Sequence, residues 1–256
     1  MFLKIKGAIQ VKIAEGIEMI ELPVKVIGNE SIIYPTIIWD KDTVILVDAG
    51  MADSLSEIRN AVESIDVPFE RLNKIIITHQ DIDHIGGIKS ILNELNEVKV
   101  LAHEEDKPYI QGEKKLVRLN SNFMERINSL PEEEQKKVLD MLENISVPVD
   151  ITLEDGEELT DCGGIVVIHT PGHTPGHISL YHKASKTLVV GDAMNIAEGQ
   201  LVGPNELLLT EEDTKTATNS LKKFEKYDVK NVITYHGGMF NSNPNQRIKE
   251  FNKDEA

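Results

Sequence analysis

The stretch HQDIDHIGG, residues 79–87, places two histidines and two aspartates within six residues and follows them with two glycines. It comes directly after the apolar run KIIIT, residues 74–78, which is typical of a buried strand. Acid and imidazole groups at this density are not needed to fold a domain. The stretch therefore indicates a binding or catalytic loop at the end of a core strand.

The composition is that of an aliphatic-cored soluble protein, with 40% hydrophobic and 5% aromatic residues in 256. We expect a single domain over residues 1–256. The chain has no apolar run long enough to span a membrane and begins without a secretion signal pattern, so we expect a cytoplasmic protein.

The net charge of −16 argues against nucleic acid and anionic membranes as partners. The lysines are scattered among glutamates and aspartates, as on a solvated helical face. We therefore expect a small-molecule substrate, and a homodimer stays open.

The single cysteine, Cys162, excludes an internal disulfide, which fits a reducing compartment. It stands beside Gly163 and Gly164, so we predict a packing role at a turn rather than a nucleophile.

Apolar runs and turn residues predict an α/β fold in which packed sheets carry outer helices. The expected strands are 2–5, 17–26, 31–39, 43–47, 74–78, 98–102, 149–153, 165–170, 178–181, 187–190 and 232–235. The expected helices are 53–64, 85–95, 211–226 and 242–253, with a helical insertion near 104–146 that contains two or three helices.

Further acid and imidazole groups follow other predicted strands, where ligand sites of open α/β sheets lie. If these groups converge without a basic partner, they need a cation between them. Seven groups are too many for one tetrahedral metal and suit two metals that share a carboxylate. The candidate ligands are His79, Asp81, Asp83, His84, His173, Asp192 and His236. We expect Gly86 and Gly87 to let the backbone pass close to the metals.

Five segments in order resemble the metallo-β-lactamase-fold hydrolases. HQDIDHIGG resembles their His-x-His-x-Asp-His signature, and VDAGM (47–51), HTPGHTPGH (169–177), VVGDA (189–193) and ITYHGG (233–238) resemble the other ligand segments. Within the family, the chain looks most like the acyl-homoserine-lactonase-like branch and its small uncharacterised metallo-hydrolases.

This resemblance implies an αββα sandwich with two metal ions between the sheets. By analogy, one metal site consists of His79, Asp81 and His173, and the other of Asp83, His84 and His236. Asp192 would bridge both ions, and Asp48 would orient a ligand by hydrogen bonding.

The chain departs from the family pattern at Asp81, where the family usually has histidine. The added negative charge makes the centre a weaker Lewis acid and favours harder metals. The shorter side chain could also leave that site weakly occupied. We expect two divalent ions, zinc foremost, with iron or manganese as alternatives, since the flavodiiron branch has a comparable glutamate and uses iron.

The resemblance implies a hydrolase in which a hydroxide held by two metals cleaves a small ester, lactone or thioester. Asp83 would steer the proton of the nucleophile. Asn195 stands where lactonases carry tyrosine, which counts against a lactonase, and could donate a hydrogen bond to a substrate carbonyl. The mixed-charge tail makes a glyoxalase II-type thioesterase less favoured. An iron-dependent oxidoreductase on the same fold is the alternative, although no electron-transfer module accompanies it.

Three other histidines have less defined roles. A helix-start or surface role is favoured for His103. His169 and His177 flank His173, and both a contact with the ligands and a packing role stay open for them. Substrate specificity is expected in the loops 24–40, 104–125 and 194–209.

Overall fold

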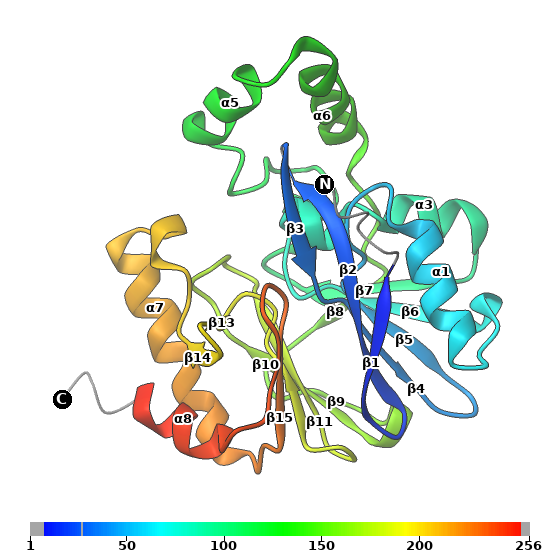
Figure 1. Cartoon of the computed structure of the whole chain (residues 1–256), viewed down its shortest axis with the longest axis vertical. Helices are drawn as coiled ribbons and strands as arrows, with labels where there is room; N and C mark the ends of the chain where they lie inside the picture. Colours follow the sequence, from blue (N-terminus) through cyan, green and yellow to red (C-terminus); the bar gives the residue numbers. More distant parts are fainter. Residues whose placement is uncertain (1–7, 27, 252–256) are drawn as a thin grey trace, which may run out of the picture.

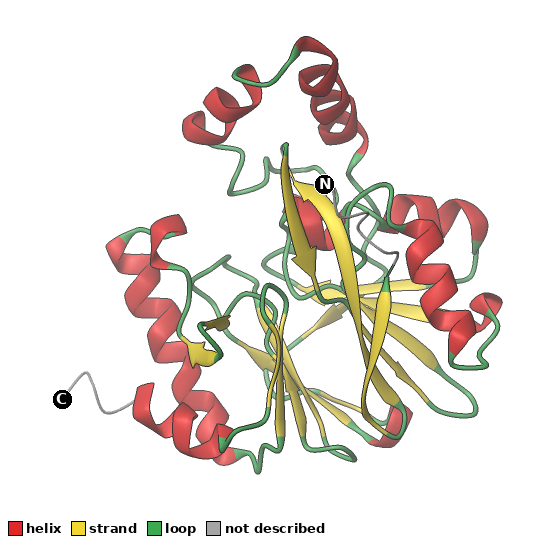
Figure 2. Ribbon diagram, in the orientation of Figure 1, coloured by secondary structure: helices red, strands yellow, loops and turns green. Residues whose placement is uncertain are grey.

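In the computed structural model, which describes residues 8–26 and 28–251, two β-sheets face each other and helices cover their outer sides (Figure 1, Figure 2). The strand expected at 2–5 lies outside the described residues.

The first sheet holds eight strands within the described residues, in the order β1-β2-β4-β5-β6-β7-β8, with β3 paired to β2. Its amino-terminal strands run antiparallel, whereas β5 to β8 run parallel. The strands are β1 Ile9–Ala14, β2 Ile17–Val26, β3 Asn29–Ile33, β4 Thr36–Trp39, β5 Val44–Val47, β6 Leu72–Ile76, β7 Lys99–His103 and β8 Ile151–Leu153.

The second sheet has the order β16-β15-β12-β11-β10-β9, in which only the β12–β15 pair is parallel among the described strands. A separate two-stranded ribbon, β13-β14, follows β12. The strands are β9 Glu158–Leu159, β10 Ile165–His169, β11 Ile178–His182, β12 Thr187–Val189, β13 Asn195–Ala197, β14 Gln200–Val202, β15 Asn231–Thr234 and β16 Gly238–Phe240.

Short helices and 3₁₀ turns connect the strands. The helices are α1 Leu55–Ser64, α2 Ile82–Ile85, α3 Ile88–Glu94, α4 Lys107–Ile110, α5 Ser121–Asn128, α6 Glu132–Asn144, α7 Glu211–Leu221 and α8 Pro244–Phe251. The 3₁₀ turns are η1 Phe69–Arg71, η2 Asp161–Gly163, η3 Glu206–Leu208 and η4 Lys222–Lys226.

Alternating side chains of the strands build separate hydrophobic layers. In β5, Ile45 and Val47 face the core between the sheets, where they join Val167 and Leu180 of the second sheet. The intervening residues of β5 face the outer core instead, with residues of α1 and α3. A third core lies between the second sheet and the elements α7, η4 and α8. The predicted αββα sandwich is therefore confirmed.

Several predicted boundaries are wrong for local reasons. The expected strand 31–39 is two strands, because the chain bends at Pro35, whose carbonyl accepts the amide of Ile20. The expected helix 85–95 begins at Ile82 and is interrupted at Gly86 and Gly87. The helix expected at 211–226 changes to a 3₁₀ turn after Leu221. Strands β1, β9 and β16 and the β13-β14 ribbon were not anticipated.

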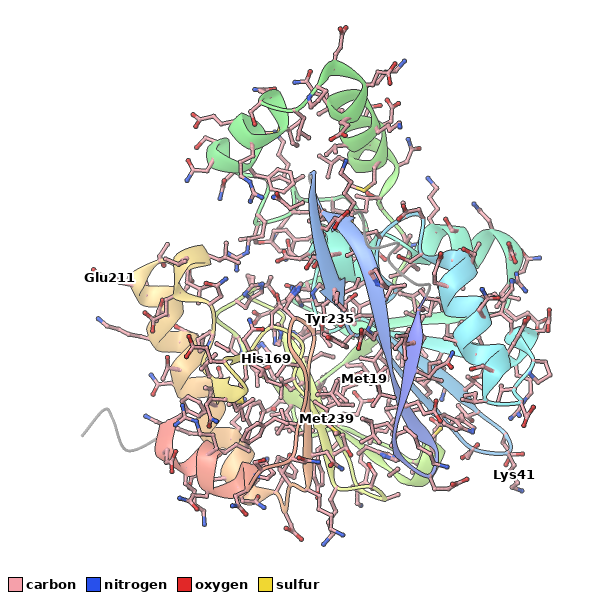
Figure 3. All side chains as sticks on the ribbon, in the orientation of Figure 1. Met19, Lys41, His169, Glu211, Tyr235 and Met239 are labelled. Carbon is pink, nitrogen blue, oxygen red and sulfur yellow. The ribbon has the colours of Figure 1, made fainter. Side chains whose placement is uncertain are left out.

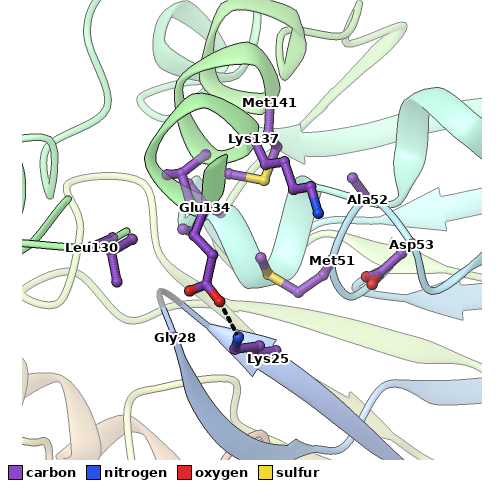
Figure 4. Close-up of a pocket in the computed structure, with 11 residues that line it drawn as sticks. Lys25, Gly28, Met51, Ala52, Asp53, Leu130, Glu134, Lys137 and Met141 are labelled. Carbon is purple, nitrogen blue, oxygen red and sulfur yellow. Dashed lines mark hydrogen bonds and ion pairs between the residues drawn. The ribbon is translucent and has the colours of Figure 1, made fainter. Parts of the chain in front are cut away.

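The helical insertion contains α4, α5 and α6, as predicted. Its α5 and α6 stand apart from the sheets at one end of the molecule (Figure 1). No residue of α6 is fully buried, and Glu134 of this helix pairs with Lys25 of β2 at 2.8 Å. A hollow of about 340 Å³ lies beneath α6, with Met51, Leu130 and Met141 on its wall (Figure 4). Helix α6 is therefore only loosely packed against the rest of the structure.

Among the described helices, none combines the length and the apolar character that crossing a bilayer requires.

Candidate metal centre

Loops from both sheets bring the seven predicted ligands to one place. One group comes from the segment after β6, and the other residues follow β10, β12 and β15 of the second sheet. The seven side chains form three clusters, of which the third shares one residue with each of the other two, and within each cluster the donor atoms lie within 4.8 Å of one another. These clusters are His79, Asp81 and His173; Asp83, His84 and His236; and His79, His84 and Asp192.

Asp192 lies at the centre of the group. Its Oδ2 atom is 3.5 Å from His173 Nε2 and 3.3 Å from His236 Nε2. Its other oxygen, Oδ1, is 3.5 Å from His84 Nε2. A carboxylate with imidazoles around both of its oxygens has the geometry of a bridging ligand.

The first cluster converges on one oxygen of Asp81. Asp81 Oδ2 lies 3.4 Å from His79 Nε2 and 3.0 Å from His173 Nε2. In the second cluster, Asp83 Oδ2 lies 3.3 Å from His236 Nε2. Each cluster thus pairs two imidazoles with one carboxylate of its own.

Buried polar atoms without a hydrogen-bond partner concentrate at this place within the described chain. They include His79 Nε2, Asp81 Oδ1, His84 Nε2, His173 Nδ1 and Asp192 Oδ1. Unpaired buried donors and acceptors are costly, at about 1–3 kcal/mol each, and call for a partner. Imidazole nitrogens and carboxylate oxygens facing one another are donors suited to divalent cations. The residues present therefore fit divalent metal ions.

Asp48 orients the ring of His84 through the ring nitrogen that points away from the cluster. Its Oδ2 lies 2.9 Å from His84 Nδ1, and the carboxylate also accepts hydrogen bonds from the amide and hydroxyl of Thr78 at 2.8 and 2.7 Å. Asp48 has a backbone φ of +59°, a conformation that aspartate tolerates better than most residues. The structure thus shows the orienting hydrogen bond expected for this residue, which leaves Nε2 of His84 facing the cluster.

The histidines around His173 divide into two kinds. His177 contacts the cluster: its Nε2 accepts the amide of Asp192 at 3.1 Å, and its Nδ1 lies 2.8 Å from Thr170 Oγ1. His169 instead stacks on His103, with ring centroids 3.9 Å apart, and bonds to the Pro175 carbonyl. Figure 3 labels His169. The surface role favoured for His103 is wrong, because the stacked ring is buried.

Asp106 is a buried residue that the sequence interpretation missed. Its carboxylate accepts hydrogen bonds from the amide and side chain of Gln80, from the hydroxyl of Thr174 and from the amide of Gly176, at 2.8 to 3.0 Å. It therefore ties the loop of His79 to the loop of His173. In the sequence it follows two glutamates and resembles an exposed helix start.

Gly86 and Gly87 lie where two backbone segments pack closely together. A side chain on Gly87 would meet the Ala49 carbonyl at 2.1 Å, and one on Gly86 would meet the Ile82 carbonyl at 2.6 Å. The amide of Gly87 also donates to the Gly50 carbonyl at 3.0 Å. The two glycines thus let the HQDIDHIGG segment pack closely on the loop that carries Asp48. The expected approach of the backbone to the metals stays a prediction.

The surroundings of His236 and His177 shift the pKa values of these two imidazoles in opposite directions. Burial opposes the charge on His236, but Asp192 and Asp83 outweigh it and raise its pKa to about 9. Burial, with neighbouring imidazoles, holds the pKa of His177 well below its usual range. His177 is therefore a neutral ring that accepts from Asp192 and donates to Thr170.

Cys162 has the packing role that was predicted. It lies buried in the inter-sheet core, with its thiol facing the carbonyls of Ile38 and Thr43. Burial, supported by Asp40 and Asp161, raises the pKa of this thiol to about 12. Such a thiol is a poor nucleophile.

A cleft of about 660 Å³ opens beside Asp81 and Asp83. Its walls come from Val26, the segment 116–126 and the segment 207–213, which overlap or adjoin the loops expected to set specificity. The walls are mostly apolar and carry Arg118 and Arg126. Asn195 is half-buried at the start of β13 and is not among the residues that line this cleft in the described structure. Its contact with a substrate stays a prediction.

The sandwich and the acid–imidazole cluster together define a metallo-hydrolase. Residues 28–236 match the family model of the metallo-beta-lactamase superfamily, so the chain belongs to that superfamily. It is similar to the probable metallo-hydrolase YflN of Bacillus subtilis, with 32% identity over 206 residues that cover 75% of each chain.

Two other relatives extend the comparison. A hydroxyacylglutathione hydrolase of Pseudomonas paraeruginosa is 30% identical over 130 residues, which cover 50% of this chain and 35% of that protein. The crystal structure of the metallo-beta-lactamase family protein TTHA1429 from Thermus thermophilus has the same fold. Its TM-score is 0.69 at 22% identity, over 95% of this chain and 80% of that one.

Proposed function

We propose that the chain uses two divalent metal ions to hydrolyse a small ester, lactone or thioester. The observation that carries this proposal is the set of three overlapping ligand clusters around Asp192. When bound, the two ions would activate a water molecule and polarise the carbonyl that it attacks. The side chains of this chain would bind the ions and the substrate and would transfer protons.

The ligand residues would form one set for each ion. His79, Asp81 and His173 would hold one ion, and Asp83, His84 and His236 the other, with Asp192 between them. Asp83 lines the cleft, and its carboxylate would take the proton of the attacking water. Asp48 orients the ring of His84, and His177 accepts a hydrogen bond from the backbone amide of Asp192.

The cleft supports a small acyl substrate. Val117, Leu207 and Leu208 present exposed apolar side chains there, and Leu207 is 95% exposed. Exposed leucines on a cleft wall favour an apolar acyl group over a highly charged one. The similarity to a hydroxyacylglutathione hydrolase of Pseudomonas supports including thioesters among the substrates to be tested.

The donor set bears on which metals would bind. Four imidazoles favour zinc, whereas three carboxylates shift the preference toward harder ions such as iron or manganese. We propose zinc as the resident metal.

A metal analysis combined with a substrate panel tests this function. Protein purified without added metal is expected to hold close to two equivalents of metal and to hydrolyse at least one ester, lactone or thioester. Chelation should abolish turnover, and zinc should restore it. Asp192→Asn is expected to lower kcat/KM by about 10²-fold or more, because the bridging charge is lost. Turnover that survives complete chelation would contradict the proposal, and two irons with oxygen uptake would favour an oxidoreductase.

A further inference from the structure

Arg118 reaches the metal centre from the segment between α4 and α5. Its Nε lies 3.5 Å from Asp81 Oδ2. One terminal nitrogen donates to the carbonyl of His173 at 2.6 Å, and the other donates to the carbonyl of Leu208. The guanidinium therefore touches one ligand carboxylate, the backbone of a second ligand and the opposite wall of the cleft.

Arg118 is the one arginine or lysine that pairs with the ligand carboxylates in the described part of the chain. The other partners within 4.0 Å of Asp81, Asp83 and Asp192 are imidazoles. Buried carboxylates repel one another and need counter-charge close by. The positive charge of Arg118 therefore partly neutralises the ligand carboxylates.

One oxygen of Asp81 has three neighbours, because His79, His173 and Arg118 all approach its Oδ2. Its Oδ2 lies 3.0 Å from the Nε2 of His173 and 3.5 Å from Arg118 Nε. Neither Asp81 Oδ1 nor Arg118 Nε has a hydrogen-bond partner in the described structure, although both atoms are buried. The guanidinium is therefore held near the oxygen that would bind a metal without forming a good hydrogen bond to it.

We propose that Arg118 is a positioning residue that supplies the counter-charge of Asp81 and thereby lowers the metal affinity of the cluster His79, Asp81 and His173. This inference rests on the proposed metal centre. The guanidinium stabilises Asp81 when no ion is bound there, and it repels a divalent ion that binds the same oxygen. Arg118 therefore increases the stability of the metal-free protein and decreases its affinity for metal.

The test measures both quantities on the full chain. Arg118→Met removes the charge and keeps much of the apolar stem, whereas Arg118→Lys keeps the charge without the planar fork. Arg126→Met is the matched control, because Arg126 lines the same cleft without pairing with Asp81. The readouts are the thermal midpoint after chelation and a zinc titration against a chromophoric chelator.

Arg118→Met is expected to lower the thermal midpoint of the stripped protein and to tighten zinc binding at the cluster of His79, Asp81 and His173 by about tenfold, because a repelling positive charge is removed. Arg118→Lys should keep the zinc affinity close to that of the wild type, and Arg126→Met should change neither quantity. A purely structural arginine would lower stability and weaken zinc binding together, and that result would overturn the proposal.

A double-mutant cycle keeps the pairing testable if Arg118→Met is too unstable for titration. Asp81→Asn alone leaves the positive charge of Arg118 without its carboxylate partner, so it should destabilise the stripped protein, and adding Arg118→Met should restore part of the loss. Additive losses would overturn the pairing. If the wild type bound no zinc, the proposed function and the affinity half of this inference would both fail. Zinc binding by the wild type without tightening in Arg118→Met would overturn this inference alone.

Discussion

The hydroxyl of Tyr235 donates a hydrogen bond of 2.6 Å to the main-chain carbonyl of Asp83. The ring of Tyr235 also packs on His84, with centroids 3.8 Å apart, and Figure 3 labels it at the middle of the molecule. Asp83 and His84 follow β6 of the first sheet, and Tyr235 follows β15 of the second. This residue therefore fixes the distance between ligands that come from opposite sheets.

Removing this hydroxyl should loosen the second cluster without opening a cavity. Tyr235→Phe keeps the ring on His84 and leaves the Asp83 carbonyl unpaired, which is expected to cost about 1–2 kcal/mol of unfolding free energy. Chemical denaturation measures this loss, with Tyr181→Phe as the control for a tyrosine hydroxyl on another buried ring. Unchanged stability in Tyr235→Phe would show that the bond contributes nothing net.

Asp48 should control the metal affinity of His84. Asp48→Asn keeps the left-handed backbone, which asparagine tolerates, and weakens the bond to His84 Nδ1; we expect a loss of about 10- to 100-fold in zinc affinity. Asp48→Ala adds backbone strain and should be less stable than Asp48→Asn. Competition titration and thermal melts separate the two effects. Equal zinc affinity in Asp48→Asn and the wild type would contradict the orienting role.

Asp106 should matter for stability although it lies outside the ligand set. Asp106→Asn retains the size of the side chain but replaces an acceptor oxygen by a donor, facing the amide protons of Gln80 or Gly176. We expect a loss of about 2–4 kcal/mol of unfolding free energy together with weaker zinc binding. Glu104→Gln is the control for a charge change in the same acidic segment. A stable Asp106→Asn with normal zinc binding would refute its linking role.

Metal binding should release protons, because the pKa of His236 is raised to about 9. A raised pKa stabilises the folded, stripped protein fully below the usual pKa of 6.5, and this contribution is lost as the pH rises through about 9. Zinc must displace that proton, so zinc affinity should increase by up to about tenfold per pH unit between these two values. Calorimetry in buffers of different ionisation enthalpy counts the protons. Zinc binding at neutral pH without proton release would contradict the raised pKa.

Cys162 should be chemically inert in the folded protein. Its burial and its pKa of about 12 leave little thiolate at neutral pH. Iodoacetamide is expected to modify the thiol only after denaturation, and Cys162→Ala should retain full turnover. Rapid labelling of the native protein would contradict the packing role.

The layers of the fold were predictable because the apolar runs and their alternation follow the strands and helices directly. The run 74–78 overlaps strand β6 and continues it, and its isoleucines are buried in the cores on both sides of the sheet, so its composition alone identifies it. The segment around Pro35 was misread because the alternation continues across a bend that only the pairing with β2 reveals. The ribbon of β13 and β14 was missed because each strand is three residues long.

The convergence of the ligands was predictable from acid and imidazole groups at strand ends, and the structure brings all seven together. Their supporting residues were not, because a buried carboxylate and a surface carboxylate look alike in a sequence. Asp106 and Arg118 lie in a charged helical stretch whose pattern is typical of a solvent-exposed face. Only the fold shows that both side chains turn inward toward the ligand loops.

Four of the seven ligand candidates follow a strand of the first sheet, and the other three come from the second. Each half of the sandwich therefore carries an incomplete ligand set and gains a complete one only by docking on the other. Bound ions would act as a cross-link at the seam between the halves. A copy of the chain that is cut or misassembled would lose its chemistry and this cross-link in the same event, so only intact molecules would turn over substrate.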